Sequence, residues 1–220
     1  MNVSFHDVTN SSEIRTYITQ ADASLLAMGY TEHSFAHVGK CAQVAAHILT
    51  DLGYSPREVE LARIAAYMHD IGNVVNRADH AQSGAVMAFR LLDKMGMAPV
   101  DVAAVVTAIG NHDESTAFPV NAVAAALILA DKTDVRRSRV RNADPATFDI
   151  HDRVNYAVTQ SDVLLDTEAK TVTLSLALDT SVCAVMEYFE IFLQRMLLCR
   201  RAAAFFSLQF RLEINGQSLL

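Results

Sequence analysis

The stretch AAYMHDIGN, residues 65–73, decides how this sequence is interpreted. It ends an apolar helical pattern and places His69 and Asp70 just before Gly72. An imidazole and a carboxylate at such a point leave the core side of the helix together and can face one metal ion. These groups are the ligands expected for Fe, Mn or Zn, whereas Mg takes mostly oxygen. The stretch therefore predicts part of a metal site at the end of a buried helix.

The sequence on both sides of this stretch has a helical pattern from Ser11 to about Lys132. The helix that leads into it has a strong start, because Ser55 can cap it, Pro56 suits the first helical position and Glu58 completes a capping box. We expect further helices over about 11–26, 32–51, 79–96, 99–110 and 120–132.

The character of the chain changes after these helices. Residues 134–149 are polar and Arg-rich, and Pro145 breaks any helix there. Strand patterns follow at 156–159 and 163–165, and the turn 166–170 leads into an alternating run, which predicts a hairpin. A helix over about 181–204 and an alternating run over 206–214 complete the chain. The predicted fold is therefore mainly α: a helical bundle over residues 1–149 and a small ββαβ appendage over 150–220.

The 220-residue chain has 51% hydrophobic residues and a formal net charge of −7. This composition indicates a folded globular protein. The negative charge argues against nucleic acid as a partner, because the phosphate backbone would be repelled. A small phosphorylated substrate stays compatible, since a bound metal inverts the charge locally.

Targeting features point to the cytoplasm. Residues 1–14 lack the basic start and the apolar run of a secretory signal, and the longest apolar stretch, 120–130, is too short to span a bilayer. Cys41, Cys183 and Cys199 show neither metal-ligand spacing nor a disulfide framework. We therefore expect a reduced, cytoplasmic location and no membrane partner.

Two buried positions offer further metal ligands. His37 lies in the middle of the helix over 32–51 and shares a face with Cys41. Asp131 ends an apolar run, where a carboxylate is costly unless it is paired or bound to a metal. Together with His69 and Asp70 they can hold one ion, and Asp70 is able to bridge to another.

Two more histidines fit a second ion. His80 lies at the start of one predicted helix and His112 at the end of the next, so one site could collect both. With Asp70 bridging, the second ion would lie roughly 3.5–4 Å from the first, as in hydrolytic two-metal sites. Lys132, next to a predicted ligand, is placed to hold a phosphate oxygen, and a structural ion pair explains it equally well.

The order of these residues resembles the HD superfamily of metal-dependent phosphohydrolases, and the two intermediate histidines make it similar to the dinuclear branch. The resemblance is closest to the YqeK-like family, which hydrolyses dinucleoside tetraphosphates symmetrically. It covers about His33 to Arg137 and rests on His37, His69-Asp70-Ile71, His80 through Gly84-Ala85, Ala108-Ile109 to His112, and Ala130-Asp131-Lys132. The chain departs from that family at Asp113-Glu114 and at Thr133-Asp134-Val135.

The resemblance implies an HD-type domain over residues 1–149 in which metal-activated water attacks phosphorus. It implies two divalent transition-metal ions, Fe or Mn before Zn, Co or Ni, with a ligand set of His37, His69, Asp70, His80, His112 and Asp131. Asp70 and Lys132 are the predicted catalytic residues. Because Arg137 matches a basic position of the family, Lys132 and Arg137 are predicted to bind the substrate, a small phosphorylated compound such as a nucleotide.

Alternatives stay open at this point. The convergent ligands favour a phosphohydrolase, but a regulatory module could bind a nucleotide through the same fold without turnover. A mononuclear nucleotidase would leave His80 and His112 unligated. The appendage over 150–220 is either a self-association surface, which would give a homodimer, or a cap over the site.

Overall fold

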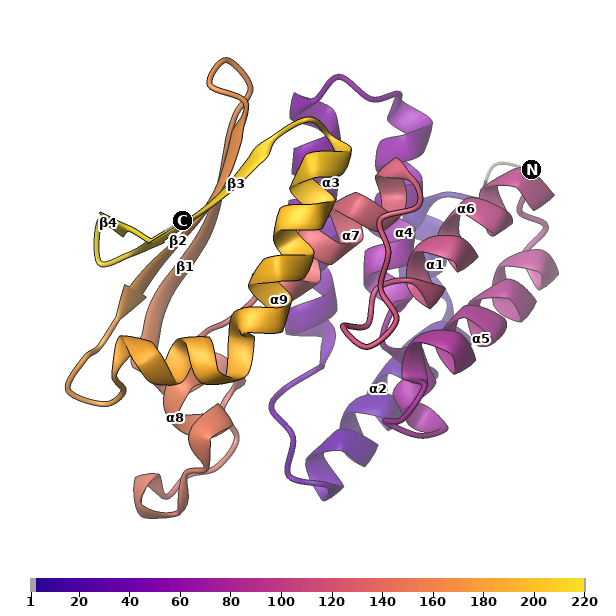
Figure 1. Cartoon of the computed structure of the whole chain (residues 1–220). Coiled ribbons are helices and arrows are strands. Elements are labelled where there is room, and N and C mark those ends of the chain that lie inside the picture. Colours follow the sequence, from indigo (N-terminus) through magenta and orange to yellow (C-terminus); the bar gives the residue numbers. More distant parts are fainter. Residues whose placement is uncertain (1–2, 220) are drawn as a thin grey trace.

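The computed structural model of the chain describes residues 3–219, with a helical part on one side and a small sheet on the other (Figure 1). The helical part contains α1 (Phe5–Asn10), α2 (Ser12–Ala27), α3 (Phe35–Asp51), α4 (Pro56–Met68), α5 (His80–Lys94), α6 (Pro99–Gly110) and α7 (Ala122–Lys132). Short 3-10 helices lie between and after them, namely η1 (Ile71–Val74), η2 (Arg137–Arg139) and η3 (Pro145–Thr147). The predicted mainly α fold is confirmed.

Helix starts follow the capping residues. Ser55 and Glu58 form the predicted capping box at the start of α4. Ser34 and Asn121 cap α3 and α7, so both helices begin a few residues later than predicted. Helix α1 was not predicted, because this short helix buries only one residue, Val8, and gives no apolar periodicity.

The C-terminal sheet has the strand order β1-β2-β3-β4, with β1 (Val158–Asp166), β2 (Thr171–Leu178), β3 (Gln209–Ile214) and β4 (Gln217–Ser218). Strands β1 and β2 form the predicted antiparallel hairpin. Strand β3 pairs parallel with β2 after the chain has crossed over through α9 (Val185–Phe205). The short β4 pairs antiparallel with β3 and extends the predicted ββαβ pattern by one strand.

One predicted strand start is wrong. Tyr156 and Ala157 belong to helix α8 (Ile150–Ala157) rather than to the first strand, which begins at Val158. The side chain of Asp149 accepts a hydrogen bond from the N–H of Asp152 and caps this helix. A strand-like composition over four residues could not outweigh that local capping bond.

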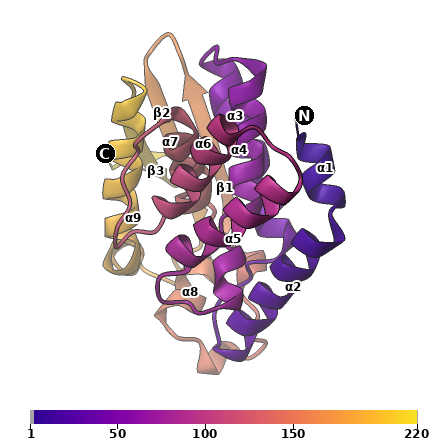
Figure 2. The ribbon, with the colours of Figure 1, turned by 90° about the vertical axis from the view of Figure 1, so that its right-hand side faces the viewer.

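Two hydrophobic clusters meet at α3 and α7. The first lies among the helices of the N-terminal part and includes Met68 and Leu127. The second lies between the sheet and helices α9, α3 and α7, and includes Ile48 and Leu129. Figure 2 shows α5 and α6 on the side away from the sheet, whose strands lie behind them. Helix α7 is buried from Val123 onward, so it holds its last residues in a fixed position.

Among residues 3–219, the helices are all too short or too polar to cross a membrane.

Candidate metal centre

All six predicted metal ligands meet between helices α3 and α7. They come from the body of α3, the segment after α4, the first residue of α5, the segment after α6 and the end of α7: His37, His69, Asp70, His80, His112 and Asp131. Each of these side chains is buried, and the most exposed residue, Asp131, is only 9% exposed.

The end of α4 presents the His69-Asp70 pair. Helix α4 ends at Met68, and the chain continues directly into the 3-10 helix η1. The side-chain amide of Asn73 donates hydrogen bonds to the carbonyl oxygen and to Oδ1 of Asp70, at 2.9 and 3.0 Å. This short turn therefore fixes the Asp70 carboxylate with Oδ2 toward the cluster.

Close packing of η1 against α5 brings Asp70 and His80 together. A Cβ atom at Gly72 would lie 2.0 Å from the carbonyl oxygen of His80 and 2.5 Å from the nitrogen of Gly84, so only glycine permits this approach. Asp79, just before α5, has a left-handed φ of 55° that turns the chain into the helix. Nε2 of His80 lies 3.5 Å from Oδ1 of Asp70.

The four histidines share one hydrogen-bond pattern. Each Nδ1 faces an acceptor outside the cluster: Oδ2 of Asp134 for His37 (2.8 Å), and the carbonyl oxygens of Ala66 for His69 (2.7 Å), Arg77 for His80 (3.1 Å) and Ile109 for His112 (2.6 Å). A histidine that donates through Nδ1 has a bare lone pair on Nε2. Metal-binding histidines are commonly held in this way.

The Nε2 atoms and the two carboxylates converge. Nε2 of His37 lies 3.3 Å from Oδ1 of Asp131, and Nε2 of His69 lies 3.3 Å from Oδ2 of Asp70. The buried atoms His69 Nε2 and Asp70 Oδ2 have no hydrogen-bond partner. Because an unpartnered buried polar atom is costly, these donor atoms fit a bound cation.

His80 and His112 give the same indication independently. Their Nε2 atoms lie 3.2 Å apart, while both Nδ1 atoms face carbonyl oxygens. Two lone pairs at this distance repel each other unless a positive charge lies near both, and NH1 of Arg77 lies 3.4 Å from Nε2 of His80. Imidazole and carboxylate donors together suit a transition-metal ion such as Fe, Mn or Zn.

The charges of the cluster perturb its pKa values strongly. Burial lowers the pKa of His69, but the Asp70 and Asp131 carboxylates outweigh it and raise this pKa to about 10, so a metal ion that binds Nε2 would displace a proton from it. Burial and the charge of His69 lower the pKa of His112 to about 3. Burial would raise the pKa of Asp131, yet the Lys132 ammonium and His69 hold it well below its usual range. Burial would also raise the pKa of Asp70, but the charge of His69 outweighs it and holds this pKa well below its usual range. Both carboxylates are therefore ionised and attract cations.

Asp134 supports the cluster, a role that was not predicted from the sequence. Its carboxylate lies 2.8 Å from Nδ1 of His37, 3.0 Å from Nζ of Lys40 and 2.9 Å from Nε of Arg136. Burial would raise the pKa of Asp134, but the hydrogen bond from His37 holds it well below its usual range. The spacing of three residues from Asp131, about one helical turn, was the available sequence signal.

Cys41, on the same face of α3 as His37, lies beside the cluster. Its sulfur, the imidazole of His37 and the carboxylate of Asp131 lie within reach of one ion. Burial and the charge of Asp131 raise the pKa of Cys41 well above its usual value, and the thiol donates to the carbonyl oxygen of Ala130 at 3.7 Å. In this form Cys41 is a neutral neighbour of the ligands.

Lys132 lies where the sequence placed it, beside Asp131. Its Nζ is 2.7 Å from Oδ2 of Asp131 and 3.2 Å from Oε2 of Glu114. The other oxygen of Glu114 lies 2.6 Å from Nε of Arg195 on α9. Burial lowers the pKa of Lys132, but the two carboxylates outweigh it and raise this pKa above its usual value. A chain of charged groups thus connects the cluster to the C-terminal helix.

Arg137, the other predicted substrate-binding residue, does not join the site. Its Nε donates to the carbonyl oxygen of Tyr156 at 2.6 Å, and its guanidinium lies over the Tyr156 ring, 4.4 Å from the centroid. Arg139 lines the cleft over the cluster instead. The 3-10 helix η2 contains both arginines and directs their side chains to different neighbours.

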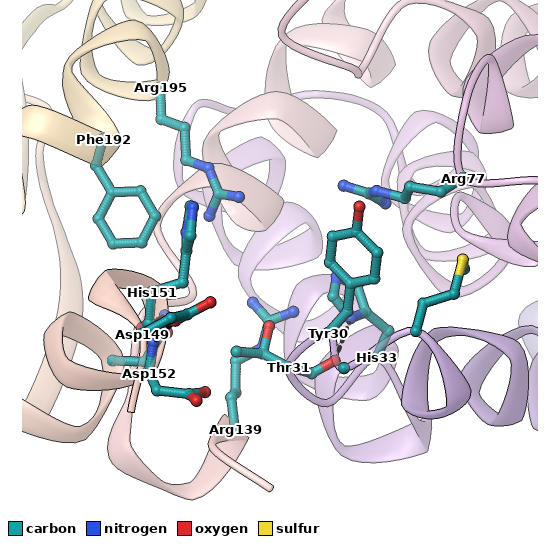
Figure 3. Close-up of a pocket in the computed structure, with 13 residues that line it drawn as sticks. Tyr30, Thr31, His33, Arg77, Arg139, Asp149, His151, Asp152, Phe192 and Arg195 are labelled. Carbon is teal, nitrogen blue, oxygen red and sulfur yellow. Dashed lines mark hydrogen bonds between the residues drawn. The ribbon is translucent and has the colours of Figure 1, made fainter. Parts of the chain in front are cut away.

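A cavity of about 450 Å³ adjoins the cluster (Figure 3). Four residues line both the cavity and the narrow cleft over the cluster: His33, Arg77, Arg139 and Arg195. The cavity wall also includes Tyr30 from the helical part, and Asp149, His151, Asp152 and Phe192 from the C-terminal segment. Of these lining residues, Arg139 and Asp149 lie in the polar, Arg-rich stretch 134–149 that the sequence showed. Arg77, Arg195 and the α8 residues carry no motif, and only folding brings them together.

The chain is similar to known proteins over part of its length. Residues 34–136 match the family model of the HD domain. A solved structure of a predicted HD superfamily hydrolase from an uncultured Thermotogales bacterium is 27% identical, with 56% of this chain and 67% of that chain covered and a TM-score of 0.45. The search of curated proteins gave no significant match.

Proposed function

We propose that this chain, with an HD-domain match over residues 34–136, is a metal-dependent phosphohydrolase that acts on a nucleotide or a related phosphate ester. One observation carries the proposal: four Nε2 atoms converge with two carboxylates, and His69 Nε2 and Asp70 Oδ2 are buried there without partners. Buried polar atoms in folded proteins normally have partners. A cluster that leaves two of them free, beside a cavity, is suited to hold metal and present it to a substrate.

The ligands divide into two overlapping sets, one for each of two divalent ions. We expect one ion to be held by His37, His69, Asp70 and Asp131, and a second by Asp70, His80 and His112. Donor atoms of His37, His69 and Asp70 lie within 4.8 Å of one another, and so do those of Asp70, His80 and His112, which supports a bridging role for Asp70. The donor types favour Fe or Mn, with Zn, Co and Ni as alternatives.

Divalent ions at such a site lower the pKa of water and neutralise charge on a phosphoryl group. The chain's own side chains position the substrate. Two of the three N–H donors of Lys132 face Asp131 and Glu114, and the third can reach a phosphoryl oxygen in the cleft that Lys132 lines. Arg77 and Arg195 line the cleft and the cavity, so they can hold a phosphate with its phosphorus toward the cluster.

Metal content and phosphate release test this proposal. Elemental analysis of the purified chain should give about two ions per chain, as in two-metal hydrolases. A panel of nucleotides with Mn or Fe should then release phosphate. Activity should be lost on chelation and return when the metal is restored.

Two substitutions on one helix sharpen the test. His37→Ala should abolish binding of the ion that His37 holds together with His69, Asp70 and Asp131. Hydrolysis should be lost with it. His47→Ala is the matched control, because His47 lies on the same helix α3 but is exposed and pairs with Asp51. His112→Ala should lower the metal content from about two ions to about one.

The two alternatives, a regulatory module and a mononuclear enzyme, predict different experimental results. A chain that binds two ions but releases no phosphate from any nucleotide would contradict the proposal and favour a regulatory module. One ion per chain and full activity in His112→Ala would contradict the dinuclear site and favour a mononuclear enzyme.

A further inference from the structure

The cavity beside the metal cluster changes charge along its length. Arg195, on α9, lines both the cleft over the cluster and the cavity, whereas Asp149 and Asp152, at the start of α8, line only the cavity. The cavity therefore has a basic end next to the cluster and an acidic end next to α8. Figure 3 shows Phe192 and Arg195 on one side, facing Arg77 across the cavity, with Asp149 and Asp152 below them.

The basic end is built from both halves of the chain. Arg195 is fixed by Glu114, with Nε 2.6 Å from Oε1, and its guanidinium lies over the Phe192 ring, 4.6 Å from the centroid. Arg77 approaches from the opposite side, with NH1 4.0 Å from Oδ1 of Asp70. Each guanidinium is about a quarter exposed, at 26% of its side chain. Two such groups around one space suit an anion with several oxygen atoms, such as a phosphoryl group.

The acidic end of the cavity prefers hydrogen-bond donors to anions. Asp149 uses one carboxylate oxygen to accept from the N–H of Asp152 at 2.8 Å. Asp152 uses one oxygen to accept from the side-chain amide of Asn142 at 3.3 Å. Both side chains still line the cavity. Ionised carboxylates accept hydrogen bonds and cannot donate them, so this end attracts hydroxyl or amino groups and repels a second phosphate.

We propose that the C-terminal segment determines the substrate specificity of the site. Arg195, with Arg77, binds the phosphoryl group, and Asp149 with Asp152 binds hydrogen-bond donors on the organic part of the same molecule. The inference rests on the proposed function, since it takes the cavity as the substrate site. The ligand class is a phosphate monoester with amino or hydroxyl groups at its far end, and a cavity of about 450 Å³ is in the size range of small-molecule sites.

Binding of uncleavable phosphonates to the full, metal-loaded chain tests the inference. Calorimetry would compare adenosine 5′-phosphonate, which carries amino and hydroxyl donors, ribose 5-phosphonate, which carries only hydroxyls, and methylenediphosphonate, which carries anionic groups at both ends. The double variant Asp149→Asn with Asp152→Asn removes both charges, and Asn retains the helix cap. Asp144→Asn is the matched control, because Asp144 caps η3 outside the cavity.

We expect the double variant to change the affinities for the two kinds of probe in opposite directions. The double variant should bind the adenosine and ribose phosphonates about tenfold more weakly, as for a lost charged hydrogen bond, and methylenediphosphonate more tightly because a repulsion is removed. Arg195→Gln should weaken all three, and Asp144→Asn should change none. A loss for the adenosine compound alone would identify the amino group as the donor, and a loss for both would identify the hydroxyls.

Two results would overturn the inference: equal weakening of all three probes by the double variant, which indicates a structural role, or unchanged affinities. The outcome is separate from that of the proposed function. If the double variant changes the two kinds of affinity in opposite directions but the chain releases no phosphate, only the proposed function is contradicted. A chain that hydrolyses nucleotides without these opposite changes contradicts only the inference.

Discussion

The hydrogen bond between Asp134 and His37 determines which nitrogen of His37 carries the proton. Oδ2 of Asp134 lies 2.8 Å from Nδ1, on the side away from the cluster. Asp134→Asn removes the negative charge behind this bond and makes His37 a weaker ligand. Supporting residues of this kind are worth about 10–100-fold in metal affinity. Competition with a chromogenic chelator would measure the loss.

Asp162→Asn is the control for that variant, because Asp162 is an exposed carboxylate on β1 whose side chain accepts from Gln160. It carries the same change of charge without touching a histidine. Equal metal affinity in the Asp134 and Asp162 variants would show that the charge behind His37 does not matter.

Glu32 makes the folded chain sensitive to acid without being a ligand. Burial would raise the pKa of Glu32, but hydrogen bonds from Ser34 and the charge of Arg139 outweigh it and lower this pKa below 4.5. A lowered folded pKa means that the contribution to stability is complete above pH 4.5 and is lost as the pH falls through the folded pKa.

Glu32→Gln should therefore lower the free energy of unfolding at pH 7 by about 1.5 kcal/mol, the scale of a charged hydrogen bond. The difference from the unsubstituted chain should shrink as the pH falls below 4.5. Urea unfolding at a series of pH values would measure it. A difference that is constant with pH would contradict the role of the ionised carboxylate.

Single residues show where prediction from sequence succeeds and where it stops. His69, Asp70 and Asp131 were identifiable because each lies at the end of an apolar helix, where a buried polar group is costly unless it is paired or bound to a metal. Arg77 and Arg195 were not, because an arginine in a short connecting segment, such as Arg77, or on a partly exposed helix, such as Arg195, is ordinary and nothing in the local sequence distinguishes it. Arg137 shows the converse: a family position predicted it, and the local 3-10 helix sends its side chain to Tyr156 instead.

At the scale of elements, the contact between η1 and α5 sets the geometry of the cluster. A Cβ at Gly72 would collide with the backbone of His80 and Gly84. Gly72→Ala should therefore push α5 away from η1, at a cost of about 1–3 kcal/mol, and separate Asp70 from His80. We expect a lower midpoint of thermal unfolding and a loss of the second metal ion.

Gly39→Ala is a close control, because Gly39 lies in helix α3 and a Cβ there would meet nothing within 4 Å. Alanine in a helix interior is favoured over glycine by about 1 kcal/mol, so this variant should be as stable as the original chain or more so. If Gly72→Ala behaved like Gly39→Ala, the close approach would not be what positions the ligands.

Elements were predictable when a cap and a long apolar period agreed, and unpredictable when only one was present. Helix α4 has the capping box at Ser55 and a buried face, and it was found with its start correct. Helix α8 has a cap at Asp149 but only eight residues, and part of it was taken for a strand. Because the helix was not predicted, neither was the acidic end of the cavity, which Asp149 at its N-cap and Asp152 in its first turn form.

At the scale of the whole molecule, the helical part and the C-terminal segment share helix α7. Leu127 packs in the cluster of the N-terminal helices, and Leu129, two residues later, packs in the cluster under the sheet. Both side chains are fully buried. Because one helix completes both cores, neither core can lose its packing without weakening the other, and we expect the chain to unfold in a single transition.

Leu127→Ala and Leu129→Ala test this coupling as a matched pair. Each removes the same atoms from a buried site and should lower the free energy of unfolding by about 2–5 kcal/mol. Thermal unfolding followed by circular dichroism and by tyrosine fluorescence should show one coincident transition, shifted to lower temperature by both variants. Two separate transitions, with Leu127→Ala moving one and Leu129→Ala the other, would mean that residues 1–149 and 150–220 fold independently. Coincident transitions would mean instead that the cavity walls, which come from both parts, are held together by the same cooperative core.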